Sequence, residues 1–553
     1  MQLSIITYST IHDKPSDELF AQLMEDIPLL PALKFIVERQ DSFIFAFSDI
    51  EGQKNAIYEM RCYLNADEQR KVDEFICVQQ NPVLFMNLSC LSFYAQALRK
   101  PNTEYRALTN DEKRRVFLSY LICNENWSSH QEDGFVVDNE HPENMLLKVD
   151  MPLSEFKRHK DFKAAIYKAT QLFKFCETHS DYKKIADKFQ EEHHVTDWRL
   201  YLSNLFDLYA HSLNIEDSQL SPETLAFSEQ YAFSLSELQD DDAVDLNWLR
   251  EHFIVKESDG NILILNNNLI VDKMYQGLKF DLFKTAHNHN LTINGMELPS
   301  VGKLNELLGQ DFSEEYLLYD LLEKIYSDKK CICYRGKDLY GKIEAEPDYY
   351  LRQDNKMLLF EHKDVLIGET SKQETDVNTI VEAIADKVCR EKSKKKGRKG
   401  GPQLLFTMDG IFLQDSMQSF DVGANAVDLV YPVVTVVDSS FSALGVARAT
   451  VNRFCELSQN YETIKQRKTH VVPLTIIDID TLFILSKRLH DGVLDIFSLI
   501  GEYQNILCKK DVDIFNQPSF SSFIADYYPL YEITQDDNAF LLSNFYAELA
   551  KLG

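Results

Sequence analysis

The chain has 553 residues, of which 44% are hydrophobic and 26% are charged, a composition typical of a folded globular protein rather than a disordered one. Its 58 basic and 87 acidic residues give a net charge of −29, which excludes a generally basic nucleic-acid coat and argues against binding to anionic membranes. No apolar run approaches the ~18 residues of a membrane span, and the first residues lack the basic and apolar regions of a secretory signal. We therefore expect a cytoplasmic protein without a membrane partner.

Ten cysteines are scattered along the chain and none forms a CxxC pair, which predicts free, reduced thiols. Cys331 and Cys333 form a CxC pair, and this spacing fits one face of a strand equally well. His287 and His289 have no cysteine or carboxylate partner at a recognised spacing, so we expect surface histidines rather than zinc ligands.

Residues 1–245 are predicted to be mainly helical, because apolar residues recur at helical spacing between Leu153 and Leu213. The polar, acidic stretch 214–246 gives the predicted domain boundary. Acidic charge is concentrated early in the chain, where residues 1–300 hold 29 basic and 48 acidic residues, a net charge of −19. One hypothesis is therefore that residues 1–245 regulate the rest of the protein or bind a partner, for example by covering a basic loop.

The hydrophobic period changes after residue 245. A connector at 246–300 is predicted to contain a hairpin, because Asp259-Gly260 lies between two β-type runs and such a turn favours positive φ. Residues 301–553 are predicted to form an α/β domain, which makes the chain α+β overall. Its predicted elements are a helix at Phe312–Tyr326, strands at 331–335, 342–351 and 356–368, a helix at Val377–Lys392, and buried strands at 403–406, 430–440 and 470–480.

Three polar residues on two successive predicted strands carry the chemistry. Asp348, which follows Pro347, lies on one strand, and Glu361 and Lys363 lie on the next, with the polar stretch 352–356 as a turn. Residues two apart share one face of a strand, so Glu361 and Lys363 point together, and Asp348 meets them if the strands pair. Two such carboxylates suit Mg²⁺, and the neighbouring lysine could orient or deprotonate a water or neutralise charge on a phosphate.

This pattern resembles a known superfamily. Asp348, twelve intervening residues and then Glu361-His362-Lys363 look like the PD-(D/E)xK motif of restriction-endonuclease-like nucleases. The predicted elements over roughly 305–450 are also similar to the helix–strand–strand–strand–helix–strand core of that superfamily. The resemblance implies a restriction-endonuclease-like domain with a central mixed sheet flanked by helices, and it does not extend to the N-terminal 250 residues.

The resemblance also implies roles for individual residues. Asp348 and Glu361 would hold Mg²⁺ or Mn²⁺, the backbone carbonyl of His362 would supply another oxygen, and Lys363 would position the attacking water. A glutamate often comes from the helix before the first core strand. Glu315 is the predicted further metal ligand, and its rivals are Glu314 and Glu323.

The activity implied by the resemblance is metal-dependent hydrolysis of phosphodiester bonds, with DNA favoured over RNA and an endonuclease favoured over an exonuclease. A chain that couples such a nuclease to a large unassigned region resembles the architecture of prokaryotic phage-defence effectors. Whether a protein partner or a homo-oligomer is needed stays open.

A basic segment follows the predicted helix at 377–392. Because the protein as a whole is acidic, this local cluster is a predicted nucleic-acid-binding segment, in which each cation would neutralise a phosphate. The alternative is a solvated loop. The predicted binding residues are Lys392, Lys394, Lys395, Lys396, Arg398 and Lys399.

Other functions are compatible with the same residues. A non-catalytic binding or scaffold protein could retain a nuclease-like fold, and the motif would then be a salt-bridged β-hairpin. An RNA nuclease or a small-nucleotide phosphodiesterase would use the same metal chemistry on a different substrate.

Overall fold

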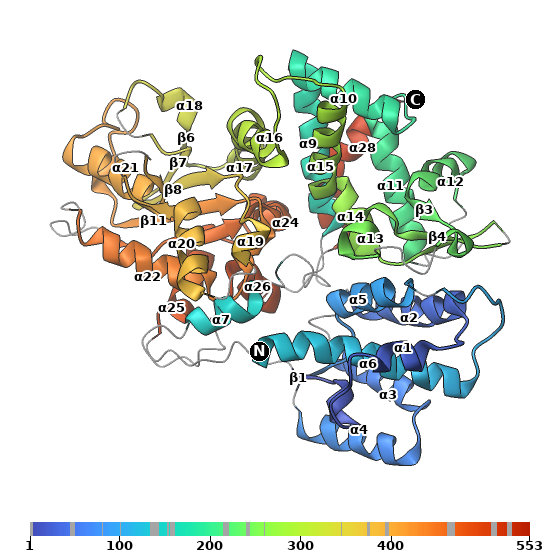
Figure 1. Cartoon of the computed structure of the whole chain (residues 1–553). Helices are drawn as coiled ribbons and strands as arrows, with labels where there is room; N and C mark the ends of the chain where they lie inside the picture. Colours follow the sequence, from blue (N-terminus) through green and yellow to red (C-terminus); the bar gives the residue numbers. More distant parts are fainter. Residues whose placement is uncertain are drawn as a thin grey trace. The chain divides into compact units, whose positions relative to one another are not determined.

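The structure is a computed structural model of the chain (Figure 1). It describes residues 4–44, 50–79, 81–99, 101–132, 143–151, 154, 161–213, 220–238, 244–258, 260–343, 346–372, 376–392, 397–461, 470–509, 517–527 and 534–552. The chain is α+β, as predicted. None of the helices in the described ranges is long and apolar enough to cross a membrane.

Two compact units make up the chain, and each combines several stretches of sequence. Unit 1 consists of Met1–Phe135, Phe156–Phe162 and Asp187–Leu278, and unit 2 of Val136–Glu155, Lys163–Ala186 and Lys279–Gly553. The predicted segments 1–245, 246–300 and 301–553 do not follow this division. The physical reason is long-range packing within unit 2, where α9 (Phe162–Thr178) joins the C-terminal part of the chain: its Tyr167 donates a hydrogen bond of 2.8 Å to Asp320 and stacks on Phe483.

Unit 1 is mainly helical. A small three-stranded sheet contains β3 (Ala232–Phe233), β4 (Ile254–Lys256) and β5 (Ile262–Ile264), and the antiparallel β4–β5 pair confirms the predicted hairpin. Gly260 in its turn has a φ of 87°, while Asp259 lies outside the described residues. A second, short sheet pairs β1 (Ser4–Ile5) with β2 (Pro82–Val83). The helices are α1 (Leu19–Met24), α2 (Leu29–Ile44), α3 (Ile50–Arg61), α4 (Ala66–Val78), α5 (Asn87–Ala97), α6 (Asn110–Glu132), α11 (Trp198–Ser212), α12 (Pro222–Ser228), α13 (Leu246–Glu251) and α14 (Asn267–Met274), with α10 (Ser180–Glu192) and α15 (Gln276–Asn288) crossing the division between units.

Unit 2 is built around a mixed six-stranded sheet. Its strands are β6 (Ile332–Arg335), β7 (Tyr349–Gln353), β8 (Lys356–Lys363), β11 (Leu429–Val436), β12 (His470–Val471) and β13 (Thr475–Asp478). The order is β12-β11-β8-β7-β6, with β13 also paired to β11, and Figure 1 shows β6, β7, β8 and β11 side by side. The β6–β7 and β7–β8 pairs are antiparallel, whereas β11 runs parallel to β8, β12 and β13.

Helices pack around this sheet, and one of them replaces a predicted strand. Residues 403–406 belong to α21 (Gly401–Leu413), because Gly401-Pro402 begins a helix there and an apolar run of this length fits a buried helix as well as a strand. The predicted helix at 377–392 ends earlier, at Val388. The other helices are α7 (Glu143–Asp150), α16 (Val301–Leu308), the π-helix η4 (Gly309–Tyr319), α17 (Asp320–Tyr326), α18 (Gly336–Leu339), α19 (Glu369–Lys372), α20 (Val377–Val388), α22 (Val446–Ser458), α24 (Ile479–His490), α25 (Ile496–Leu507), α26 (Phe520–Tyr527), α27 (Gln535–Leu541) and α28 (Ser543–Leu549).

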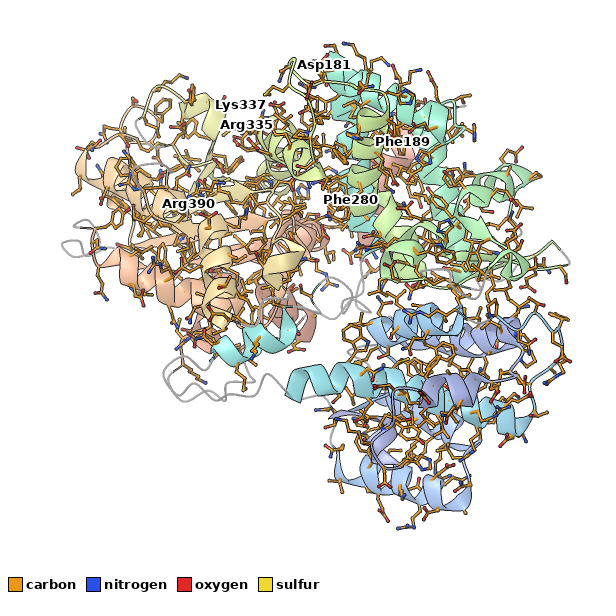
Figure 2. The ribbon with its side chains drawn as sticks, in the orientation of Figure 1. Asp181, Phe189, Phe280, Arg335, Lys337 and Arg390 are labelled. Carbon is orange, nitrogen blue, oxygen red and sulfur yellow. The ribbon has the colours of Figure 1, made fainter. Side chains whose placement is uncertain are left out.

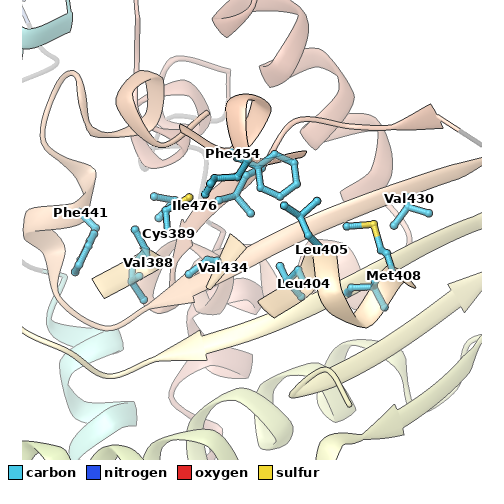
Figure 3. Packing of buried hydrophobic residues seen from close by; sticks show 14 of the residues in the cluster. Val388, Cys389, Leu404, Leu405, Met408, Val430, Val434, Phe441, Phe454 and Ile476 are labelled. Carbon is cyan, nitrogen blue, oxygen red and sulfur yellow. The ribbon is translucent and has the colours of Figure 1, made fainter. Parts of the chain in front are cut away.

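Both faces of the sheet are buried, which explains why β8 and β11 are apolar along nearly their whole length. On one face, Leu404 and Met408 of α21 and Phe454 of α22 pack with Val430 and Val434 of β11 in a hydrophobic cluster (Figure 3). On the other face, the ring of Tyr431 contacts Phe497 of α25, and Phe360 contacts Tyr349. A charged side chain on these central strands is therefore expected only at a strand end or with a partner.

Candidate active site

The β7–β8 hairpin brings the first two residues of the motif together. Its register pairs Tyr349 with Phe360 and Gln353 with Lys356, so the turn is Asp354-Asn355, within the predicted turn. Asp354 has a φ of 52°, which is the left-handed conformation that such tight hairpins require. Asp348 lies one residue before β7 rather than on it, where continuing the register places it opposite Glu361.

Asp348 and Lys363 converge on Glu361 at the end of β8. The Oδ2 atom of Asp348 accepts a hydrogen bond of 2.6 Å from the backbone N–H of His362 and lies 4.0 Å from Lys363 Nζ. Lys363 Nζ also forms an ion pair with Glu361 Oε1. The side chain of Glu361 is fully buried, whereas those of Asp348 and Lys363 are 17% and 15% exposed. The alternation of strand side chains thus places the three predicted residues in one cluster, as the sequence suggests.

The surroundings of this cluster disfavour the ionised form of its carboxyl groups. Burial, followed by the charge of Asp348, raises the pKa of Glu361 to about 8. Burial also raises the pKa of Asp348. Glu361 Oε2 is buried and has no hydrogen-bond partner among the described residues. A buried carboxylate oxygen without a donor is costly, and a bound cation would satisfy it.

The helix before β6 contributes Glu314 rather than the predicted Glu315. Glu314 accepts a hydrogen bond from the Tyr319 hydroxyl, and burial followed by the charge of Asp348 raises its pKa to about 7. Glu315 is instead 51% exposed and forms an ion pair with Lys337 of α18. Lys337 is labelled in Figure 2. The Glu315 carboxylate is thus paired with Lys337 rather than with a residue of the cluster.

The π-helical geometry of η4 accounts for this difference. The sequence predicts an ordinary helix over 312–326, but residues 309–319 form a π-helix and only 320–326 are α-helical. A π-helix has more residues per turn than an α-helix, which changes the residue that faces a given neighbour. The other rival, Glu323, is ion-paired with Arg335.

The side chain of His362 is held on the opposite face of β8 from its two neighbours. Its Nδ1 lies 2.9 Å from the Thr435 hydroxyl of β11, and burial lowers its pKa to about 4. Among the described residues its Nε2 has no hydrogen-bond partner. The neutral imidazole thus fixes β8 against β11, and a role as a metal ligand is left to the backbone carbonyl.

The basic segment forms part of a hairpin that leads back to the cluster. Strand β9 (Cys389–Arg390) pairs with β10 (Lys399–Gly400), and β10 lies against β8. A side chain at Gly400 would collide with the carbonyl of Val388, so only glycine allows this close hairpin base. The predicted binding residues Lys394, Lys395 and Lys396 lie outside the described residues.

The remaining cations of the segment differ in their surroundings. Arg398 is paired with Glu391 at 2.9 Å and stacks over the Phe406 ring, and Lys392 is exposed. Lys399 is half-buried, and burial together with the charges of Arg390, Lys363 and Lys387 lowers its pKa. The charge of Asp386 partly opposes this shift, but in the part of the chain that the structure describes Lys399 forms no ion pair with a carboxylate. A cation in this position favours the binding of an anion next to the Glu361 cluster.

The described residues contain no group of three or more His, Cys, Asp and Glu side chains already arranged around a metal position. In the cluster described above, Lys363 occupies Glu361 Oε1 and the His362 N–H occupies Asp348 Oδ2. The donor set of hard carboxylate oxygens and the unpartnered Glu361 Oε2 nevertheless fit Mg²⁺ or Mn²⁺.

Comparisons with known proteins give no relative for this chain. No protein-family model matches it, and searches of curated proteins and of solved structures also find no match. The chemistry of the cluster therefore has to carry any functional conclusion.

The raised pKa of Glu361 predicts how stability depends on pH. A carboxyl whose pKa rises from 4.5 in the unfolded chain to about 8 in the folded one stabilises the protein below pH 4.5, and this contribution is lost as the pH rises through 8. In EDTA, the urea concentration at the midpoint of unfolding should be lower at pH 9 than at pH 6. This decrease should be larger for the wild type than for Glu361→Gln. Equal falls in the two proteins would contradict the shift.

Proposed function

We propose that this protein is a metal-dependent nuclease that hydrolyses phosphodiester bonds, with DNA favoured over RNA as the substrate and internal cleavage favoured over cleavage from an end. The observation that supports it most is the cluster of Asp348, Glu361 and Lys363 at the end of β8, in which Glu361 Oε2 lacks a partner among the described residues. The order of a helix, three antiparallel strands, a helix and a parallel strand around it adds support, because it resembles the core of PD-(D/E)xK nucleases.

In this proposal Asp348, Glu361 and Glu314 would hold Mg²⁺ or Mn²⁺, together with the carbonyl of His362. A bound metal of this kind supplies Lewis-acid polarisation of a phosphate and a water of lowered pKa. Glu314 takes the place that the sequence assigns to Glu315, because the latter is committed to Lys337.

Lys363 would act as a cation rather than as a base. Burial alone would lower its pKa, but the charges of Glu361 and Asp348 outweigh burial and raise it. The lysine is therefore an ammonium at neutral pH, able to donate hydrogen bonds to an attacking water and to a phosphate oxygen. Such fixed charge stabilises the transition state without further rearrangement.

A second candidate function is a non-catalytic scaffold. Its support is the ion pair of Lys363 with Glu361 and the absence, within the described ranges, of an assembled group of metal ligands. Metal binding separates the two candidates, since a scaffold stabilised by its own ion pair has no need of Mg²⁺. A role in prokaryotic antiviral defence, and an acidic N-terminal region that regulates cleavage or binds a partner, remain proposals at the level of architecture.

The proposal is tested by incubating the purified full chain with supercoiled plasmid DNA, structured RNA and a small-nucleotide phosphodiester, each with Mg²⁺, Mn²⁺ or EDTA. Metal-dependent cutting of DNA supports it. Cutting of RNA alone or of the small substrate alone would replace DNA by that substrate. A folded protein that cuts none of the three substrates with Mg²⁺ or Mn²⁺ present would favour the scaffold.

Two neighbouring glutamates allow a matched test of the metal ligands. Glu314→Gln is expected to weaken Mn²⁺ binding about 10- to 100-fold, because it removes a partly buried carboxylate whose pKa is raised by the charge of Asp348. Glu315→Gln should leave binding within about twofold of the wild type, because Glu315 is half exposed and pairs with Lys337. Calorimetric titration with Mn²⁺ measures both, and equal effects would contradict the assignment of Glu314.

Lys399 and Lys392 offer a similar comparison for the substrate phosphate. Lys399→Ala is expected to lower the cleavage rate at saturating DNA about 10-fold or more, because Lys399 is half-buried beside the cluster. Lys392→Ala should lower affinity modestly and leave the rate at saturation unchanged, because Lys392 is exposed. Single-turnover cleavage over a range of protein concentrations separates the two effects. If Lys399→Ala changes affinity only, Lys399 belongs with the solvated cations.

A further inference from the structure

Cys331 and Cys333 face each other at the edge of the unit 2 sheet. Cys333 lies on β6, the last strand of the order β12-β11-β8-β7-β6, and Cys331 comes one residue before that strand. Their Sγ atoms are 3.4 Å apart, and both side chains are partly exposed. Residues two apart on a strand share a face, but contact between their sulfur atoms also requires both side chains to lean toward each other.

The surroundings of the two thiols make them unequal. The hydrogen bond from Cys333 and the nearby charge of Lys329 lower the pKa of Cys331 to about 7, although burial opposes this. The same contact raises the pKa of Cys333. A substantial fraction of Cys331 is therefore thiolate near neutral pH, and the thiolate is the reactive form. By contrast, burial raises the pKa of Cys389 to about 12.

We propose that Cys331 and Cys333 form a dithiol site that hydroperoxides oxidise reversibly to an intramolecular disulfide. The site is separate from the proposed active site and does not depend on nuclease activity. Cys331 is the attacking residue, and Cys333 is the resolving residue.

The reaction balances in two steps. The Cys331 thiolate attacks one peroxide oxygen, the O–O bond breaks, and the leaving oxygen takes a proton, which gives a sulfenic acid and an alcohol, or water from hydrogen peroxide. The Cys333 sulfur then attacks the Cys331 sulfur, the S–O bond breaks, and the oxygen leaves as water with the thiol proton. The two cysteines lose two electrons and two protons in total, and the hydroperoxide gains them.

Strand geometry suggests that this disulfide would be strained and easily reduced. Two residues of an extended strand span about 6.6 Å between Cα atoms, near the upper limit of about 6.8 Å for disulfides. The β6–β7 ladder begins at Ile332 paired with Arg352, so Cys331 lies outside it and can approach Cys333 without breaking a ladder hydrogen bond. Strained, accessible disulfides are the labile ones, which accounts for reversibility.

Trypsin provides a direct readout, because cleavage after Lys330 and Arg335 releases both cysteines in the single peptide 331–335. The reduced full chain is treated with hydrogen peroxide for increasing times, remaining thiols are alkylated, and the digest is analysed by mass. The exposed Cys62 and Cys77 serve as internal references. We expect the mass of this peptide to fall by two hydrogen atoms as the disulfide forms, and its cysteines to become resistant to alkylation. This change should be about tenfold faster than the oxidation of either reference cysteine. Dithiothreitol should restore the reduced peptide.

Two variants distinguish this dithiol site from thiols that are oxidised only because they are exposed. In Cys333→Ser the disulfide cannot form, and Cys331 should accumulate as a sulfenic acid that dimedone traps. In Cys331→Ser, oxidation of Cys333 should slow to the rate of the reference cysteines or below. The proposal is overturned if the wild-type peptide stays alkylated while Cys62 and Cys77 are oxidised, or if Cys331→Ser leaves the oxidation of Cys333 as fast as before.

Discussion

Replacing Lys363 with alanine is expected to lower the rate of phosphodiester cleavage by about 10²- to 10³-fold while the protein remains folded. Lys363 is the only cation paired with Glu361 among the described residues, and its ammonium lies 4.0 Å from Asp348. Its loss removes the hydrogen-bond donor that would orient the attacking water and stabilise charge on the phosphate. Single-turnover cleavage of plasmid DNA measures the rate.

Lys337→Ala is the matched control for Lys363→Ala. It also removes one positive charge from unit 2, but its partner is the half-exposed Glu315 rather than Glu361 or Asp348. We expect cleavage by Lys337→Ala to stay within about twofold of the wild type. If both variants cut at the wild-type rate, Lys363 is not part of the reaction. Circular dichroism and thermal unfolding of each variant test whether a low rate is caused by misfolding.

Replacing Lys279 with methionine is expected to destabilise unit 2 by about 3–5 kcal/mol, because it would leave the Asp364 carboxylate buried without its cation. Lys279 Nζ lies 2.9 Å and 3.1 Å from the two carboxylate oxygens of Asp364, and both side chains are only 1% exposed. Asp364 directly follows Lys363, so this pair fixes the chain at the point where β8 ends. Urea unfolding of unit 2 measures the effect.

Two comparisons make the result for Lys279 specific. Lys303→Ala breaks the exposed pair with Glu306 on α16 and should change stability by less than about 0.5 kcal/mol. The double variant Lys279→Met/Asp364→Leu replaces both charges with apolar groups and should recover most of the loss. Equal destabilisation in the single and double variants would show that packing, rather than the unpaired charge, sets the cost.

The sequence alone predicts the β7–β8 hairpin and the meeting of Asp348, Glu361 and Lys363, because both depend on local features. The period of two along a strand and the short polar turn determine which side chains face each other. The same reasoning explains why His362 lies on the opposite face, against Thr435. The mixed sheet of unit 2 is also what the resemblance implies, although no relative of known structure supports the superfamily itself.

Features that depend on long-range packing could not be predicted in this way. The π-helical turn of η4, which brings in Glu314 and turns Glu315 toward Lys337, has no clear signal in the hydrophobic pattern. The buried pair of Lys279 with Asp364 joins residues far apart in the chain. The division into discontinuous units likewise follows from contacts between distant stretches rather than from composition at a linker.

The nicking of supercoiled plasmid DNA by the full chain tests the central claim most directly. The account predicts nicked or linear product with Mg²⁺ or Mn²⁺, none with EDTA, and none with Asp348→Asn, which keeps an oxygen for the His362 N–H but removes the charge. The account is contradicted if the folded wild-type protein leaves DNA intact with both metals. It is also contradicted if the Asp348→Asn variant cuts DNA as well as the wild type does.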